Sequence, residues 1–260
     1  MFGYQNIFVL ACLGLALSEA AFVDTLHKCD YKDRECLKKD IQTTLLGISD
    51  SGIPEYDIPP IDPLHIENIK LNLLNVIDLT ILEGTVKGIK NCEVNDLKLN
   101  MEKGHFTMKV TCDISAKGKY DITGSSPALK ELVGGSSVRG SGNAKIKIEK
   151  VSMKFDYTFE VVRRPDGEVY IECKKDLAKY DFDLLGGSKL QLEKLYVGDV
   201  ESSQLLTTYY NENAKTLWKT FGRTVMDSVA DIAYQFIHNF FGRVPTKYYL
   251  SGDLTPFIKP

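Results

Sequence analysis

The 260-residue sequence has little of the long apolar character that a membrane span requires. One apolar run, Ile7 to Leu17, covers about eleven residues, and no second run like it follows. A spanning helix needs roughly 18 or more apolar residues. The run is followed by Ser18-Glu19-Ala20, which is typical of a signal peptide cleaved near Ala20. We therefore predict a signal peptide over residues 1–20 and a secreted, extracellular single domain over residues 21–260, without stable membrane insertion.

The sequence also lacks an excess of charge of one sign. Its 32 basic and 35 acidic residues leave a net charge of −3, and both signs are interleaved. This pattern gives no electrostatic footprint for a phosphate backbone, so nucleic acid is excluded as a partner. The first half of the predicted sheet is rich in lysine, but nearby acids dilute it, which favours a solvated surface over an anionic-membrane stripe. The lysines concerned are Lys98, Lys103, Lys109, Lys117 and Lys119.

Catalytic signatures are missing. No Gly-x-Ser-x-Gly occurs, and the nearest segment, residues 47–51, lacks the final glycine. Gly140-Ser141-Gly142 is not followed by the Gly-Lys-Ser/Thr of a phosphate-binding loop. The histidines show no pairing with a nucleophile, and a structural role is favoured for His27, His65, His105 and His238. We predict no catalytic residue and no cofactor; a hydrolase of a lipophilic ester is the enzymatic alternative.

Cysteines are few, and five remain after residue 20, an odd number for an oxidising compartment. Cys29 and Cys36 lie seven positions apart in a charged segment, and we predict a disulfide between them. Zinc is not expected there because only His27 is close. A turn at Lys103-Gly104 is predicted to pair Met101 with Phe106, Leu99 with Met108 and Leu97 with Val110, which leaves Cys112 opposite Asn95. A Cys92–Cys112 bridge would then need a bulge to bring the two residues together. A buried thiol is the favoured interpretation for Cys112 and Cys173. The pairing of Cys92, Cys112 and Cys173 stays open.

Hydrophobic periodicity divides the rest of the chain. Apolar residues at helical spacing predict an amphipathic helix within residues 24–47, and four prolines in residues 52–64 predict an extended connector on the surface. From Ile66 to Val197 apolar residues alternate with a period of two, which predicts long strands over residues 106–116 and 151–161. A turn at Pro165-Asp166-Gly167 is predicted to join the second of these strands to a returning strand. Shorter strands are predicted at 144–148 and 190–197, and residues 134–142 are predicted to be a Gly/Ser-rich loop.

One long helix is predicted over residues 202–241, about 60 Å at 1.5 Å per residue. Its apolar positions from Tyr210 to Phe240 average 3.75 residues apart, which does not fit a coiled coil. A broad apolar stripe on so long a helix can be buried by an antiparallel sheet curved along it. The predicted fold class is therefore α+β, with a long C-terminal helix wrapped by a strongly curved antiparallel sheet and a short N-terminal helix.

These features resemble the insect takeout and juvenile-hormone-binding proteins over nearly the whole mature chain. The most specific shared segments are Cys29-x6-Cys36, Gly52–Glu55 with Ile58–Leu64, Gly118-Lys119-Tyr120, Asn211-Glu212-Asn213 and Val244-Pro245. The chain departs from the pattern at Ala214, where many members have tryptophan, and at its Gly/Ser-rich segment. Hormone-binding members are expected to carry a second disulfide between strand regions, and the predicted register leaves such a disulfide open in this chain. The takeout branch therefore fits better.

The resemblance implies a monomeric secreted carrier that holds a small hydrophobic ligand in an elongated internal tunnel. Juvenile hormone, another terpenoid and a fatty-acid-like lipid are the candidate ligands, and a link to circadian or feeding behaviour is implied. Lipid transfer or sequestration at membrane surfaces is the alternative function, and a filled core without a ligand is also open. Ile41 and Leu45 are expected to act as a lid. The expected lining residues are Tyr120, Phe155, Tyr157, Phe159, Trp218, Phe221 and Val225.

Overall fold

The fold comes from a computed structural model that describes residues 22–73, 75–127 and 129–259. The predicted signal peptide, residues 1–20, lies outside the described residues. The helices are α1 (Arg34–Gly47), α2 (Leu129–Val133) and α3 (Ser203–Arg243). The strands are β1 (Cys29–Asp30), β2 (Leu64–Leu73), β3 (Ile77–Lys87), β4 (Glu93–Asn100), β5 (His105–Ser125), β6 (Ser137–Arg163), β7 (Val169–Cys173), β8 (Lys179–Leu184), β9 (Ser188–Leu192), β10 (Leu195–Val197), β11 (Val200–Glu201) and β12 (Leu250–Ser251).

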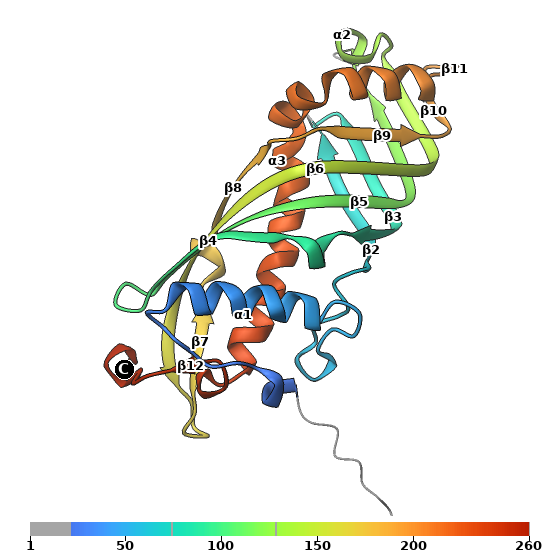
Figure 1. The fold of residues 1–260 in the computed structure, drawn as a ribbon. Coiled ribbons are helices and arrows are strands. Elements are labelled where there is room, and N and C mark those ends of the chain that lie inside the picture. Colours follow the sequence, from blue (N-terminus) through green and yellow to red (C-terminus); the bar gives the residue numbers. More distant parts are fainter. Residues whose placement is uncertain (1–21, 74, 128, 260) are drawn as a thin grey trace, which may run out of the picture.

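A large antiparallel sheet is wrapped along α3, as the sequence predicts. Its strand order within the described residues is β11-β10-β6-β5-β3-β2, with β4 paired to β5 and with β7, β8 and β9 paired to successive parts of β6. Figure 1 shows the strands crossing α3 at a steep angle. Helix α3 contacts β2 at one side of the sheet and β7, β8 and β9 at the other. The helix therefore closes the curve of the sheet.

The two central strands are longer than predicted. Strand β6 begins at Ser137, so the loop predicted over residues 134–142 is wrong, and the separate strand predicted over 144–148 is part of β6. The glycines there fit the sheet for a steric reason: a Cβ at Gly142 would lie 2.4 Å from the Glu193 carbonyl oxygen, and one at Gly140 would lie 2.8 Å from the Lys194 carbonyl oxygen. Gly118 on β5 is needed for close approach, since a Cβ at that position would lie 2.2 Å from the Glu83 carbonyl oxygen.

The strand predicted over residues 190–197 is interrupted. Strand β9 ends at Leu192 and β10 begins at Leu195, and Lys194 between them has a positive φ of 58°. The two short strands pair with different parts of β6, β9 with residues 144–148 and β10 with residues 138–140. The alternation changes phase at this break, since the apolar positions step by three residues from Leu192 to Leu195, and the prediction of one continuous strand missed this signal.

Pairing between β4 and β5 differs from the prediction, and the difference decides the second disulfide. Leu99 lies opposite Phe106 and Leu97 opposite Met108, a register shifted by two residues from the predicted one. A bulge between Val94 and Asp96 adds a further shift of one. Cys92 is thereby brought to Cys112, and the two form a disulfide. The expectation of a buried thiol at Cys112 is wrong, whereas Cys173 is a buried free cysteine.

The N-terminal segment is built around the predicted disulfide. Cys29 in β1 is bonded to Cys36 in the first turn of α1, and the Asp33 side chain caps this helix by accepting from the Cys36 amide at 3.0 Å. The proline-rich connector is not laid on the surface, because its isoleucines are buried beneath α1 and the end of α3. These are Ile53, Ile58 and Ile61. The turn at Pro165-Asp166-Gly167 joins β6 to β7 as predicted.

The long helix has the predicted extent but is not continuous. Asn213 has non-helical φ and ψ values of −115° and 15°, so α3 consists of a first segment, residues 203–212, and a long segment that follows the kink. The Asn213 side chain donates to the Tyr209 carbonyl at 2.9 Å, a local bond that competes with regular helix. Figure 1 shows the first segment lying across the end of the sheet and the rest of α3 running along the molecule in a different direction.

Candidate ligand-binding interior

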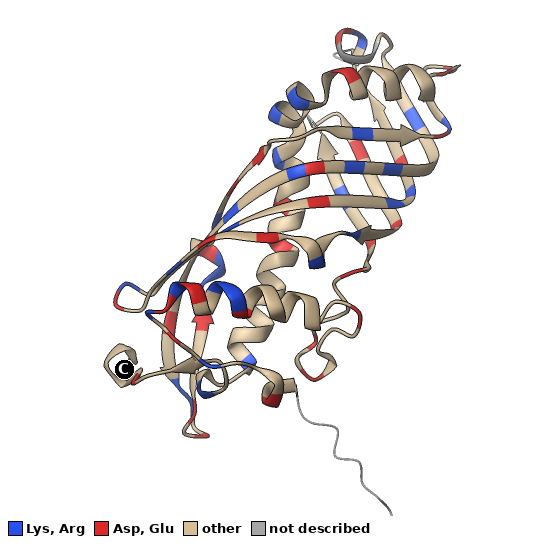
Figure 2. Cartoon of the chain, in the orientation of Figure 1, with Lys and Arg blue, Asp and Glu red and all other residues tan. Residues whose placement is uncertain are grey.

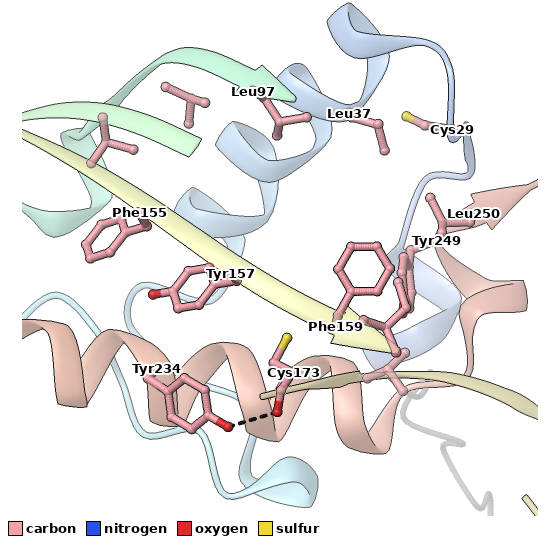
Figure 3. Packing of buried hydrophobic residues seen from close by; sticks show 14 of the residues in the cluster. Cys29, Leu37, Leu97, Phe155, Tyr157, Phe159, Cys173, Tyr234, Tyr249 and Leu250 are labelled. Atoms are coloured by element: carbon pink, nitrogen blue, oxygen red, sulfur yellow. Dashed lines mark hydrogen bonds between the residues drawn. The ribbon is translucent and has the colours of Figure 1, made fainter. Parts of the chain in front are cut away.

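The end of the molecule that holds α1, β7 and the C-terminal part of α3 has a filled core, which we call the lower core. The second half of β6 turns its aromatic residues into it, and these are fully enclosed by β7, α3 and the C-terminal segment. Figure 3 shows Phe155, Tyr157 and Phe159 in a line above Tyr234 and Cys173. Tyr157 stacks between Phe106 and Phe155, with ring centroids 6.4 and 6.0 Å apart. Phe155, Tyr157 and Phe159 are each at most 5% exposed, so protein neighbours account for their burial.

The other end differs in its burial. Along β6 from Gly142 to Ile148, outward residues are exposed while inward residues are half-buried, whereas from Val151 to Val161 most inward residues are buried. The same half-burial recurs on β3, β5 and β9, although the sheet and α3 cover these side chains from two sides. We call this set the upper interior. Its apolar members are Ile77, Leu79, Ile81, Ile114, Ala116, Ile122, Ala144, Ile146, Ile148, Leu190 and Leu192.

Side-chain size explains the contrast between the two ends. In the lower core the inward positions of β6 carry Phe155, Tyr157 and Phe159, whose rings fill the space to α3. In the upper interior the corresponding positions are aliphatic or small, and one cross-strand row reads Gly84, Gly118 and Ala144. Small side chains on a curved sheet leave volume that neighbouring side chains do not reach. Apolar side chains that stay accessible inside a wrapped sheet can contact an apolar ligand.

The first segment of α3 covers the end of the upper interior and is fastened to the edge of the sheet. Asn211 binds both backbone groups of Leu190 on β9: its Oδ1 accepts from the amide at 2.7 Å, and its Nδ2 donates to the carbonyl at 3.1 Å. The Tyr210 hydroxyl lies 2.7 Å from Ser188 Oγ and accepts from Trp218 Nε1 at 2.8 Å. We call these contacts the Asn211–Tyr210 clamp. Sequence reasoning missed it, although the Asn-Glu-Asn interruption of an apolar stripe was its visible signal.

The seven predicted lining residues do not form one group. Phe155, Tyr157 and Phe159 lie together in the lower core, buried by protein neighbours. Tyr120 is buried in the cluster around Leu129, Val138 and Leu195, and its hydroxyl donates to the Glu193 carbonyl at 2.9 Å. Whether any of these contacts a ligand stays a prediction.

The helical members of the predicted set lie at the middle of α3. Trp218 is buried against β8, with its ring 6.2 Å from that of Phe182. Phe221 is half-buried. Val225 is two turns after Trp218 and therefore on nearly the same side of the helix, yet it is 36% exposed. This exposed apolar position next to a buried one marks incomplete covering of α3 by the sheet.

Several buried hydroxyl and thiol groups are held in their neutral forms. Burial raises the pKa of Tyr120 to about 12 and that of the Cys173 thiol to about 12. Burial also raises the pKa of Tyr157 and of Tyr249, and neither hydroxyl has a hydrogen-bond partner among the described residues. None of these groups is an activated nucleophile.

The two residues predicted to form a lid lie on α1, which is fixed along β4. The Arg34 guanidinium donates to the Leu97 carbonyl at 2.8 Å and pairs with Asp96. The Gln42 side chain bridges the Cys92 carbonyl and the Val94 amide at 2.9 and 3.1 Å. Ile41 packs on the lower core, and Leu45 packs on the buried isoleucines of the connector. Their role as a lid stays a prediction.

One group of side chains has the spacing of a metal site. His27, Cys29 and Cys36 offer ligand atoms within 4.8 Å of one another. Both sulfurs are committed to the Cys29–Cys36 disulfide, so no thiolate is present to bind zinc.

In the described part of the chain, no helix is both long and apolar enough to cross a membrane.

A sheet wrapped along a helix, with an accessible apolar interior, is the architecture of a hydrophobic-ligand-binding protein. Comparison with known proteins gives the particular group. The chain belongs to the haemolymph juvenile hormone binding protein family, whose sequence model matches residues 7–251. The resemblance to the takeout and juvenile-hormone-binding proteins is thus confirmed.

Individual relatives are distant. The chain is 22% identical over 216 residues to the circadian clock-controlled protein daywake of Drosophila yakuba, covering 75% of each chain. It is 29% identical over 89 residues to the juvenile hormone-binding protein of Manduca sexta, covering 34% of this chain and 38% of that one. The crystal structure of Takeout 1 from Epiphyas postvittana superimposes with a TM-score of 0.75 at 24% identity, covering 86% of this chain and 99% of the other. This last match confirms the predicted fold.

Proposed function

We propose that the protein is a secreted, non-enzymatic carrier of one small hydrophobic molecule, with residues 21–260 acting as a single ligand-binding domain. The observation that supports this most is the half-burial of the apolar inward side chains of the upper interior. Buried apolar surface stabilises a complex by about 25 cal/mol per Å². A ligand covering about 300 Å² there gains roughly 7 kcal/mol before the cost of association. Micromolar or tighter binding follows.

The ligand lies, in this proposal, between the inward faces of β3, β5, β6 and β9 and the upper half of α3. Ala144, Ile146 and Leu192 on the sheet and Phe221 and Val225 on the helix are the proposed contacts. The Asn211–Tyr210 clamp holds the covering segment of α3 in place, and its opening lets the ligand enter and leave. The aromatic residues of the lower core support the sheet from below.

The chemical class of the ligand follows from the wall. Its inward positions are aliphatic and alanine side chains, which favour an extended chain of branched or straight hydrocarbon. Juvenile hormone, another terpenoid and a fatty-acid-like lipid all have this character. One relative is named for juvenile hormone binding, which supports this ligand class in part. Another relative is named for control by the circadian clock. A role in circadian or feeding behaviour is proposed on that second likeness alone.

Secretion is proposed on two grounds. The family is named for haemolymph, and two disulfides join four of the five cysteines after residue 20, as is usual in oxidising compartments.

Native mass spectrometry of the protein purified from its natural fluid, followed by solvent extraction, tests the proposal. We expect one apolar small molecule per chain, released by the solvent. Uptake of labelled juvenile hormone and labelled fatty acids by the extracted protein is the second arm. A protein that is free of any small molecule and takes up none of these probes is not a carrier of the proposed class.

A further inference from the structure

The outer face of the sheet carries a group of lysines that the fold has placed side by side. Lys117 on β5 lies directly opposite Lys145 on β6, and Lys147 on β6 lies directly opposite Lys189 on β9. Lys87 on β3 lies in the same row as Lys147 and Lys189, with Ser115 between. We call these five residues the outer lysine rows. Figure 2 shows blue bands at these places on the neighbouring strands β5, β6 and β9.

The outer lysine rows contain no acidic residue. The first reads His65, Thr85, Lys117, Lys145 and Gln191 across five strands, and the second reads Lys87, Ser115, Lys147 and Lys189 across four. None of the five lysines forms an ion pair within the described residues. The next row contains three acids, Glu67, Glu83 and Glu193. Glu83 is paired with Lys119 at 2.8 Å, and Glu193 accepts from Asn143 at 2.8 Å. The lysine charges are therefore left without a partner of their own.

Like charges that face each other across strands destabilise a sheet. Two such pairs side by side are not explained by the fold, since many polar residues fit an exposed strand position equally well. The face is also hollowed. Depressions of about 500 and 340 Å³ adjoin the rows and share Lys145 and Gln191, and Lys147, Lys189 and Asn211 border the second. The second depression is lined by three lysines and no acid, whereas the first also has Glu67, Glu83 and Glu193 in its lining. A hollowed surface with five unpaired lysines, on a chain of net charge −3, is suited to an anionic partner.

We propose that the outer lysine rows dock the protein on a membrane that contains anionic phospholipid, where its apolar ligand is taken up or delivered. The composition favours this partner over a specific phosphate group: all five cations are lysines, which act as mobile point charges, whereas arginine is the residue for bidentate recognition. The choice of a membrane rests on the proposed carrier function, because a hydrophobic ligand comes from and goes to lipid. The docking itself does not depend on bound ligand.

The test is co-sedimentation of the full mature chain, free of ligand, with vesicles of phosphatidylcholine and phosphatidylserine at 7:3 and with vesicles of phosphatidylcholine alone. The variant K145Q/K147Q/K189Q removes three of the charges. The control K28Q/K39Q/K103Q makes the same change in net charge at exposed, unpaired lysines elsewhere. Each lysine near an anionic surface contributes about fivefold in binding, so the triple variant is expected to lose roughly 100-fold in partition onto the anionic vesicles.

The control is expected to bind anionic vesicles within a few-fold of the unaltered protein, and 0.5 M salt is expected to abolish the difference between vesicle types. Removal of the facing like charges should also raise the Tm of the triple variant by about 1–4 °C, which shows that it folds. Equal binding to both vesicle types would overturn the proposal, as would an equal loss in the control. Lysine-dependent binding of a polyglutamate peptide without binding to vesicles would also overturn it in favour of an acidic protein partner. Uptake of labelled fatty acid, measured on the same samples, reports on the carrier function separately.

Discussion

Filling the upper interior should abolish ligand binding without unfolding the protein. Ala144 points inward from the middle of β6, is half-buried, and lies between Gly118 and Leu192 in its cross-strand row. The change Ala144→Phe places a ring in the space proposed for the ligand. If the ring displaces about 100 Å² of the ligand's contact, binding loses about 2.5 kcal/mol at 25 cal/mol per Å². The expected rise in Kd is about 60-fold.

The matched control is Ala214→Phe, the same substitution at a position on α3 that is only 8% exposed. Extra volume at a packed position costs about 1–3 kcal/mol of stability. We expect Ala144→Phe to leave the free energy of unfolding within about 1 kcal/mol of the unaltered protein, because its ring enters unfilled space. The assays are displacement of a fluorescent fatty acid and urea unfolding. If Ala144→Phe is as destabilised as the control, the upper interior is already filled; if it folds and binds normally, the ligand lies elsewhere.

Three further outcomes are expected. Asn211→Ala removes both hydrogen bonds to Leu190, which together stabilise the clamp by about 1–2 kcal/mol. Ligand dissociation measured by stopped flow should therefore be about 5–30-fold faster, while Asn72→Ala on the outer face should leave the rate unchanged. Equal rates for the two variants would show that the clamp does not control exit of the ligand. The double change Cys92→Ala with Cys112→Ala opens a loop that the disulfide closes across 20 positions, and it should lower the free energy of unfolding by about 3 kcal/mol. An unchanged Tm would contradict the Cys92–Cys112 bridge. Burial raises the pKa of Tyr120 to about 12, so this side chain favours the folded state only while its hydroxyl is protonated. Its contribution to the free energy of unfolding should be complete below about pH 10 and lost between pH 10 and 12. The difference in stability between the protein and Tyr120→Phe should therefore shrink over that range in urea titrations, and a constant difference would contradict the raised pKa.

The sequence predicts those parts of the fold that depend on periodicity. The apolar spacing of residues 202–241 and the alternation on β5 and β6 are properties of one segment each, and they give the long helix and the wrapped sheet correctly. The Cys29–Cys36 bridge is also local, since both cysteines lie around the start of one helix.

The missed features depend on contacts between segments. The β4–β5 register follows from a bulge near Asn95, where the apolar positions step by three residues from Val94 to Leu97, and the Cys92–Cys112 bridge follows from the register. The Gly/Ser-rich start of β6 resembles a loop until it is paired with its neighbours, where a Cβ at Gly142 would meet the Glu193 carbonyl oxygen at 2.4 Å.

The candidate site was only partly predictable for a similar reason. Phe155, Tyr157 and Phe159 were among the residues expected to line it, and the structure places them together in the lower core. The space lies where side chains are small, and small residues such as Ala116 and Ala144 give no signal of their own. Phe221 and Val225 are the predicted residues that remain beside accessible surface.

Photo-crosslinking would locate the apolar ligand that we propose for the upper interior. A fatty acid with a diazirine on its chain is bound to the mature protein, irradiated, and mapped by peptide mass spectrometry. We expect labels within residues 77–81, 114–122, 144–148 and 190–192 and on α3 near Phe221, and we expect unlabelled ligand and the Ala144→Phe change to block this labelling. Labels confined to residues 155–173 of the lower core, or labelling that excess ligand does not block, would contradict this proposal.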